Sequence, residues 1–120
     1  MKNWDNAAKI AIRKAGRKQR VLEKHIEGAV VQYARSLGVH VIKNATMYSN
    51  GFPDRTFLFG DGGMLLIEFK VPGAKLTPLQ KDWHGWLKKN GHRVEVVDNV
   101  EEGKRLIDEV LEQLNKWRKR

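Results

Sequence analysis

The stretch RTFLFGDGGMLLIEFK, residues 55–70, consists of two apolar runs separated by four small or polar residues. Both runs are rich in residues that favour β-strands, and the intervening GDGG is typical of a tight turn. The stretch therefore predicts a β-hairpin. A turn centred near Asp61 and Gly62 would place Asp54, which precedes the first strand, beside the end of the second strand.

The end of the second strand carries two charged residues of opposite sign. Side chains alternate along a strand, so Glu68 and Lys70 point to one face of the sheet and Phe69 points to the other. With Asp54 beside them, two carboxylates and one ammonium group should converge. Carboxylates that are close repel one another, and protonation, a lysine or a divalent cation relieves that repulsion. The cluster is therefore either a structural ion-pair network or a site for Mg²⁺, with Mn²⁺ as its substitute, because all the ligands are oxygens.

Helix and strand patterns alternate on either side of the hairpin. The predicted elements are a helix at about 20–37, a strand at 39–43, the hairpin strands at 55–59 and 64–69, a helix from Pro78 to about 90, a strand at 93–97 and a helix after Asn99. Thr77 and Gln80 form a capping pair at the start of the second of these helices, and Asn99 with Glu102 can cap the last helix. The order is α-β-β-β-α-β-α, an α/β fold with a mixed sheet flanked by helices, in which the strands at 64–69 and 93–97 run parallel.

Basic residues are concentrated at the two ends of the 120-residue chain, which has a net charge of +9. Residues 1–24 hold eight Lys or Arg against two acids, and the last five residues hold four bases. This pattern favours a polyanion partner, most often nucleic acid, over acidic lipid or improved solubility. We expect a basic arm at 1–20, whose thin apolar face is interrupted at Gly16, then a folded domain at 21–115 and a basic tail at 116–120.

The composition excludes several classes of protein. The chain has no cysteine, so disulfides and thiolate metal sites are impossible. No apolar run approaches the roughly 20 residues that span a bilayer, and the basic N-terminus lacks the apolar segment of a signal peptide. We therefore expect one folded domain in the cytoplasm, without a membrane partner.

Taken together, the motifs resemble those of a nuclease family. PD at 53–54 followed by EFK at 68–70 is similar to the PD-(D/E)XK signature. GFPDRTFLF, GGMLLIEFKVPGAKLTPLQKDWHGWL and GHRVEVVD resemble, in this order, the virus-type replication-repair nuclease (VRR-NUC) family in its short phage and bacterial form. The resemblance covers about residues 22–112. It implies a restriction-endonuclease-like core and a metal-dependent endonuclease for branched DNA such as Holliday junctions, active in DNA repair as a homodimer in a bacterial or phage-infected cell.

The resemblance also implies roles for individual residues. The predicted catalytic residues are Asp54, Glu68, Lys70 and Gln80. Lys70 would position or deprotonate an attacking water bound to Mg²⁺. The family also has an acid on the first helix, for which Glu23 and Glu27 are candidates, and the distance to Gly38 favours Glu27. The predicted metal ligands are the carboxylates of Glu27, Asp54 and Glu68 and the backbone carbonyl of Phe69.

Other residues are predicted to support the site or to bind nucleic acid. Gln80 has two possible roles, as part of the helix cap and as a support for the site, and one side-chain conformation is not expected to fill both. The predicted nucleic-acid contacts are Arg17, Lys18, Tyr48, Lys75, Lys81 and His84. The alternatives are solvated lysines, a half-buried surface histidine at 84, and core or interface positions for Trp83 and Trp86. For the whole protein the alternative is a nucleic-acid-binding module without catalysis, in which the acidic cluster is structural.

Overall fold

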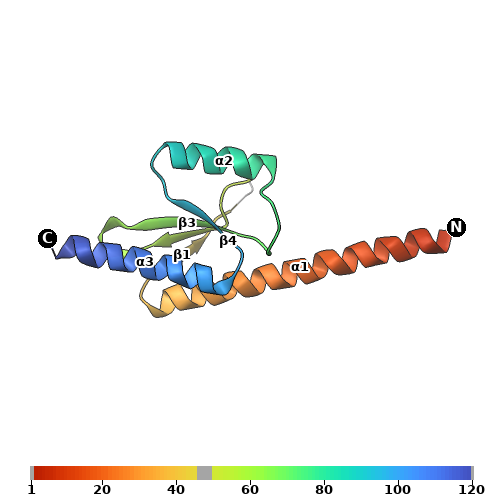
Figure 1. The fold of residues 1–120 in the computed structure, drawn as a ribbon, viewed down its shortest axis with the longest axis horizontal. Coiled ribbons are helices and arrows are strands. Elements are labelled where there is room, and N and C mark those ends of the chain that lie inside the picture. The colour runs from red at the N-terminus through yellow and green to blue at the C-terminus, as the bar shows by residue number, and fades with distance from the viewer. Residues whose placement is uncertain (1, 46–49, 120) are drawn as a thin grey trace.

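The computed structural model describes the backbone of residues 2–45 and 50–119, and side chains from Asn6 onward within these ranges. Its elements in order are α1 (Lys2–Ser36), β1 (His40–Lys43), β2 (Arg55–Leu58), the 3-10 helix η1 (Gly60–Gly62), β3 (Met64–Phe69), α2 (Pro78–Lys89), β4 (Val94–Val97) and α3 (Val100–Arg118) (Figure 1). The predicted α-β-β-β-α-β-α order is confirmed.

The four described strands form one mixed sheet in the order β1-β2-β3-β4. Strands β1, β2 and β3 pair antiparallel, whereas β3 and β4 pair parallel. The reversal between β2 and β3 occurs at η1, where Asp61 and Gly62 both have positive φ, of 58° and 82°. The predicted hairpin and the predicted parallel pair are both confirmed, and α2 is the connection between the parallel strands.

The two faces of the sheet are covered by different helices, α1 and α3 on one face and α2 on the other (Figure 1). From β3, Leu65, Ile67 and Phe69 enter the larger core under α1 and α3. Leu66 faces the other way and packs with Leu87 and other residues of the smaller cluster. Burying a side chain of this size contributes about 1.5–3 kcal/mol. Burial on both faces explains why β3 reads as a continuous apolar run.

Helix α1 is continuous through Gly16, so the interruption predicted there is wrong. A single glycine in a helix costs only about 1 kcal/mol relative to alanine, and the flanking residues are good helix formers. The C-terminal half of α1 is packed, with Ile26 and Val30 in the core, whereas residues 6–15 and 17–22 are exposed. The N-terminal half projects from the domain, giving a longest dimension of 71 Å (Figure 1). Neither α1 nor any other helix of the described residues is long and apolar enough to cross a membrane.

Both predicted helix caps are confirmed. Thr77 Oγ1 accepts a hydrogen bond from the Gln80 N–H at 3.2 Å, and Gln80 Oε1 accepts one from the Thr77 N–H at 2.9 Å. At the start of α3, Asn99 Oδ1 accepts from the Glu102 N–H at 2.8 Å. These bonds satisfy backbone donors that have no partner inside their helices. The cap at Thr77 therefore fixes where α2 begins, and with it the position of Gln80 over the sheet.

Candidate active site

Asp54 and Glu68 meet at the open end of the hairpin. In the β2–β3 pairing Arg55 lies opposite Ile67, so the next pair outward is Asp54 and Glu68. The Phe69 N–H donates to Asp54 Oδ2 at 2.9 Å, and the two carboxyl groups lie close enough for each to shift the pKa of the other. The convergence expected from the hairpin is present, because the turn is centred where the sequence placed it.

The two carboxyl groups are poorly solvated. Glu68 is only 3% exposed; its Oε2 accepts from Gln80 Nε2 at 3.2 Å, while its Oε1 is buried without a hydrogen-bond partner among the described residues. Burial and repulsion from Asp54 raise the pKa of Glu68 to about 8. Burial also raises the pKa of Asp54, against the lowering effect of the Phe69 N–H. Without a cation, the pair therefore holds a proton at neutral pH.

Lys70 lies close to these acids without pairing directly with any of them. Burial raises the pKa values of Glu23, Asp54 and Glu68, and the charge of Lys70 lowers all three, which places its ammonium group near each of them. Yet no carboxylate in the described part of the chain lies within 4.0 Å of its nitrogen. The direct ion pair of the structural alternative is thus absent there. The half-buried Lys70 keeps its donors available for another group.

The two glutamates of α1 border the same site but differ in their partners. Glu27 accepts a hydrogen bond from Arg55 Nε at 2.6 Å in an ion pair whose side chains are each 17% exposed. Glu23 has no ion pair within the described residues, and burial together with repulsion from Asp54 raises its pKa. Both glutamates line a cavity of about 290 Å³; the other lining residues are Arg20, Lys24, Lys43, Asn44 and Asp54. The structure thus leaves the choice of the helical ligand open.

Asp54 and Glu68 are chemically suited to a divalent cation. Their donors are all oxygens, which suits a hard divalent cation. They repel one another, and Glu68 Oε1 has no hydrogen-bond partner within the described residues; a bound cation would relieve both of these unfavourable features. No group of three His, Asp or Glu side chains within residues 2–45 and 50–119 is already gathered to hold a metal ion. The backbone of Phe69 reaches the site through its N–H. The ligand role of its carbonyl stays a prediction.

Asn44 is a residue of the site that sequence reasoning missed. Its N–H donates to the Asp54 carbonyl at 2.9 Å, and its Nδ2 donates to the Pro53 carbonyl at 2.8 Å. Its Oδ1 accepts from Thr56 Oγ1 at 2.9 Å. Asn44 therefore holds the Pro-Asp dipeptide from both sides. In the sequence, an asparagine after a strand is read as a turn residue, and only the fold shows these contacts.

Gln80 links α2 to the carboxylate pair. Its Oε1 accepts from the Thr77 N–H while its Nε2 donates to Glu68 Oε2, so one conformation serves both the cap and the site. The expectation that the two roles exclude each other is therefore wrong, because opposite ends of the amide make the two bonds. Gly51 lets the loop between β1 and β2 pass close to the start of α2: its φ is 87°, and an added Cβ would lie 2.6 Å from the Leu79 carbonyl carbon.

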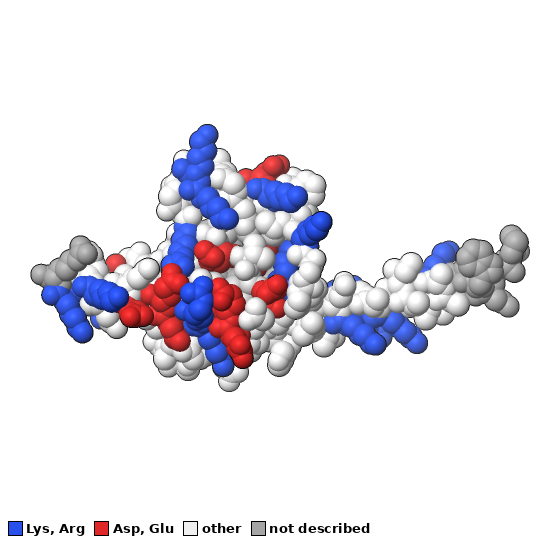
Figure 2. All heavy atoms as spheres, in the orientation of Figure 1, with Lys and Arg blue, Asp and Glu red and all other residues white. Residues whose placement is uncertain are grey.

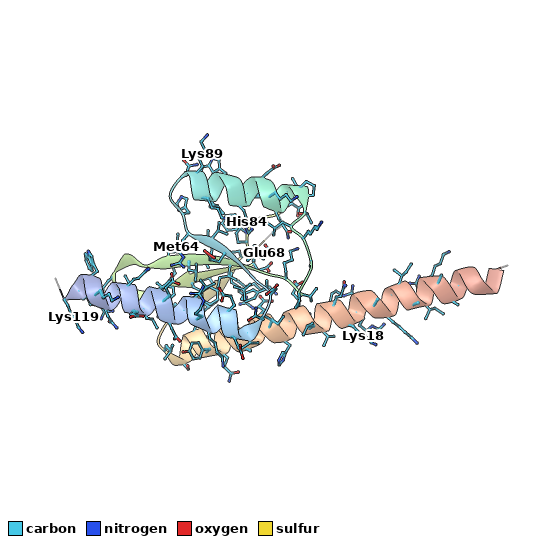
Figure 3. All side chains as sticks on the ribbon, in the orientation of Figure 1. Lys18, Met64, Glu68, His84, Lys89 and Lys119 are labelled. Atoms are coloured by element: carbon cyan, nitrogen blue, oxygen red, sulfur yellow. The ribbon has the colours of Figure 1, made fainter. Side chains whose placement is uncertain are left out.

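His84 is buried beneath α2 and is not a half-buried surface residue. It is 4% exposed, and neither ring nitrogen has a hydrogen-bond partner in the described residues. Burial lowers its pKa, and the charges of Lys88 and Lys70 lower it further, so the ring is neutral at pH 7. Figure 3 shows His84 on the side of α2 that faces the sheet. A direct contact of His84 with nucleic acid would require α2 to move.

The remaining predicted nucleic-acid contacts lie on exposed surfaces. Lys75 is in the segment between β3 and α2, Lys81 is in the first turn of α2, and Arg17 and Lys18 are on the projecting half of α1. Figure 2 shows Lys and Arg over α2 and along α1, with Asp and Glu gathered on the body over α3. Tyr48 lies outside the described residues. All of these nucleic-acid contacts stay predictions.

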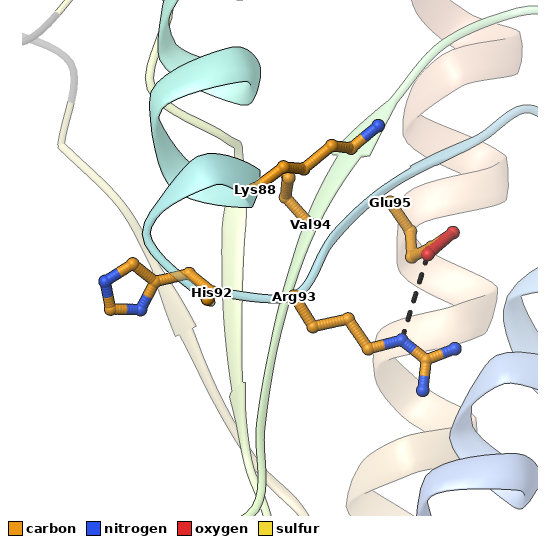
Figure 4. Close-up of a pocket in the computed structure, with 6 residues that line it drawn as sticks. Lys88, His92, Arg93, Val94 and Glu95 are labelled. Atoms are coloured by element: carbon orange, nitrogen blue, oxygen red, sulfur yellow. Dashed lines mark ion pairs between the residues drawn. The ribbon is translucent and has the colours of Figure 1, made fainter.

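Two other cavities lack paired carboxylates. One, of about 410 Å³ at the start of β4, includes His92, Arg93 and Glu95, and Arg93 forms an ion pair with Glu95 at 3.8 Å (Figure 4). Arg93 also pairs with Glu109 at 2.7 Å. The other, of about 330 Å³, is an apolar hollow on α2; its lining residues are Leu79, Asp82, Trp83 and Trp86. Acid–base or metal chemistry is therefore best supported at Asp54 and Glu68.

Comparison with known proteins gives consistent matches. The sequence pattern of the VRR-NUC domain matches residues 4–101. The chain is 34% identical over 79 residues to "Putative nuclease p44" of Acyrthosiphon pisum secondary endosymbiont phage 1, a match that covers 66% of this chain and 85% of that protein. A solved structure described as a VRR_NUC domain superposes with a TM-score of 0.67 at 25% identity, over 72% of this chain and 95% of the other.

Proposed function

Because the chain belongs to the VRR-NUC domain family, we propose that it hydrolyses phosphodiester bonds in DNA with a divalent cation held at Asp54 and Glu68. One observation carries the proposal: the buried carboxyl group of Glu68 lies beside the half-buried carboxyl group of Asp54, and one oxygen of Glu68 has no hydrogen-bond partner among the described residues. Such a pair is costly to bury, which is typical of sites built for chemistry. A purely structural cluster would gain more from a direct bond to Lys70.

Neighbouring groups of the chain hold the two carboxylates of the proposed site in position. Asn44 fixes the backbone of Asp54, and the Phe69 N–H orients its carboxylate. Gln80, on the helix α2 that covers the same face of the sheet, orients the carboxylate of Glu68. A bound divalent cation supplies a Lewis acid and an activated water. Positioning of both ligands by other groups is what keeps their geometry fixed during reaction.

Lys70 acts on the reacting groups in this proposal. It points to the same face of β3 as Glu68, and its charge lowers the pKa values of Glu23, Asp54 and Glu68. Its ammonium group positions the attacking water and offsets the negative charge that builds up on the phosphate. Glu27, the predicted helical ligand, would have to share or leave Arg55, whereas Glu23 has no such partner to displace in the part of the chain that the structure describes. Glu23→Gln and Glu27→Gln variants, compared for cation affinity, distinguish the two.

The finer expectations of a branched substrate and a homodimer belong to the same proposal. A branched substrate is supported by the family resemblance and by basic surfaces on both α1 and α2. A homodimer has a candidate surface at the apolar hollow of α2, where Leu79 and Trp86 are 54% and 55% exposed. Light scattering on the purified chain measures the assembly directly, and a monomer at all concentrations would contradict it.

The decisive experiment is cleavage of end-labelled four-way junction, flap and plain duplex DNA in EDTA, Mg²⁺ or Mn²⁺. We expect cleavage only with a cation, and faster cleavage of branched DNA. Glu68→Gln should abolish it, while Glu101→Gln, the same substitution at an exposed position on α3, should not. DNA binding without cleavage under every condition would favour the non-catalytic alternative.

A further inference from the structure

Five basic side chains lie along one side of helix α1. These residues, here called the basic stripe, are Lys9, Arg13, Arg17, Arg20 and Lys24. Their separations of four, four, three and four residues return to the same side of a helix with 3.6 residues per turn. All five are exposed, and residues 6–22 contain no acid. The projecting half of α1 therefore carries an unbroken line of positive charge.

The basic stripe leads into the candidate active site. Its last two members, Arg20 and Lys24, line the same cavity as Glu23, Glu27 and Asp54. Glu27 lies one turn after them on the same side of the helix, so the sign of the charge changes where the carboxylates begin. An anionic chain that follows the basic stripe would therefore arrive at the carboxylates.

The basic stripe is unfavourable unless something binds it. Like charges three or four residues apart on a helix repel one another. None of the five residues forms an ion pair within the described part of the chain. The opposite side of this half of α1 carries three alanines, at positions 8, 11 and 15, and the exposed Leu22. The other large exposed apolar residues, Ile10, Ile12 and Val21, are spread around the helix, so it offers a lipid bilayer no continuous apolar face. A polyanion with regularly spaced charges fits these features better than a membrane does.

We propose that the basic stripe binds the sugar-phosphate backbone of a duplex arm beside the bond to be cut. The proposal rests on the proposed nuclease function and specifies its substrate: duplex must extend from the cleavage site along α1. From Lys9 to Lys24 the helix rises about 23 Å, at about 1.5 Å per residue. At about 3.4 Å per base pair, this reach corresponds to roughly seven base pairs of duplex. Lys18 adjoins Arg17 but points about 100° away and is not part of the basic stripe.

The first test compares neighbouring residues of equal charge on different sides of α1. Arg13→Gln removes a member of the basic stripe, and Lys14→Gln removes the adjacent base. Duplex binding in EDTA is followed by fluorescence anisotropy over a range of salt concentrations. Arg13→Gln should reduce the slope of log K against log salt by about 0.9, and Arg13→Gln/Arg17→Gln by about 1.8. Lys14→Gln should leave the slope unchanged, and Arg13→Lys should restore it.

The second test varies the length of the duplex arm. Wild-type affinity should rise as the arm lengthens from about 4 to about 8 base pairs and then level off. The Arg13→Gln/Arg17→Gln variant should lose this gain and still bind the shortest substrate like the wild type. Equal effects of Arg13→Gln and Lys14→Gln, or no dependence on arm length, would overturn the proposal. So would stripe-dependent binding to phosphatidylserine vesicles with no binding to duplex.

The same measurements separate the basic stripe from the nuclease proposal. Binding in EDTA does not depend on catalysis. Stripe-dependent binding with no cleavage in any cation would therefore contradict the nuclease proposal and leave the proposal for the basic stripe standing. Conversely, cleavage that requires Asp54 but does not depend on Arg13 or on arm length would contradict the proposal for the basic stripe and leave the nuclease proposal standing. Circular dichroism of each variant shows whether the domain still folds, which is expected because these side chains are exposed.

Discussion

The acidic end of the hairpin and the basic stripe of α1 use charge in opposite ways. Asp54 and Glu68 are crowded and shielded from water, with raised pKa values. The basic stripe is exposed and unpaired in the described structure, so water screens its charges. Burial changes what a charged group can do chemically, whereas exposure lets it meet a large partner. The two regions adjoin at one cavity, where Arg20 and Lys24 border Asp54.

The largest predicted effect is that of Asp54→Asn, at the acidic end of the hairpin, on the cleavage rate. We expect the cleavage rate to fall by about 10³-fold or more, because a neutral amide cannot balance a cation held with Glu68. The fold should survive, since the amide oxygen can still accept from the Phe69 N–H and the repulsion of Glu68 is gone. Single-turnover cleavage and thermal melting measure the two effects, and a rate near that of the wild type would refute the site.

Lys70→Ala tests whether the lysine is catalytic or structural. As a catalytic group it should bind cation and DNA as well as the wild type yet cleave about 10²- to 10³-fold more slowly. As a structural partner its loss should destabilise the cation-free protein, with Mg²⁺ restoring both stability and rate. We expect the first result, because Lys70 forms no ion pair in the described structure. A rate within about threefold of the wild type at saturating Mg²⁺ excludes the catalytic role.

Removing residues 1–18 tests the exposed side of the comparison. We expect DNA affinity to fall roughly tenfold or more at physiological salt and the salt slope to decrease by about 3, because three members of the basic stripe are lost. The domain should still fold, since Ile26, Val30 and the rest of the packed half of α1 remain. An unchanged salt slope would show that the projecting half does not touch phosphate.

The raised pKa of Glu68 predicts an unusual pH dependence of stability. Because its pKa rises from 4.5 to about 8 on folding, the folded state holds a proton that the unfolded state releases between these values. In EDTA, stability should therefore fall as pH rises from about 5 to about 8, by at most about 1.4 kcal/mol per pH unit. Glu68→Gln should flatten this part of the curve. Denaturant melts at fixed pH values would contradict the prediction if stability rose instead.

The smallest expected effect is that of Gly16→Ala in the projecting half of α1. Alanine should stabilise the local helix by up to about 1 kcal/mol, while the added Cβ would lie 3.4 Å from the mobile Nη1 of Arg20. Amide exchange around residue 16 should slow, and the global unfolding midpoint should stay the same, because the side chains of residues 6–15 and 17–22 are exposed. A matching rise in the global midpoint would mean that the projecting half is part of the cooperative unit.

Much of the fold followed from local patterns. The hairpin, both caps and the parallel pairing of 64–69 with 93–97 are present as expected, because turn residues, capping residues and apolar spacing act over a few positions. The failed expectations concern competition between local and longer-range effects. Helix α1 passes through Gly16 because a weak local preference is outweighed by its neighbours, and Gln80 serves two partners because α2 lies directly over Glu68.

By itself, the sequence determined that Asp54, Glu68 and Lys70 would meet, since strand alternation and a short turn leave a hairpin little choice of register. It also determined that the positive charge lies at the chain ends. Only the tertiary structure decided that Asn44 is hydrogen-bonded to Asp54, that Arg55 forms an ion pair with Glu27, and that His84 is buried. These contacts join segments that are distant in sequence, and packing of whole elements against one another selects them. No local propensity encodes such a choice.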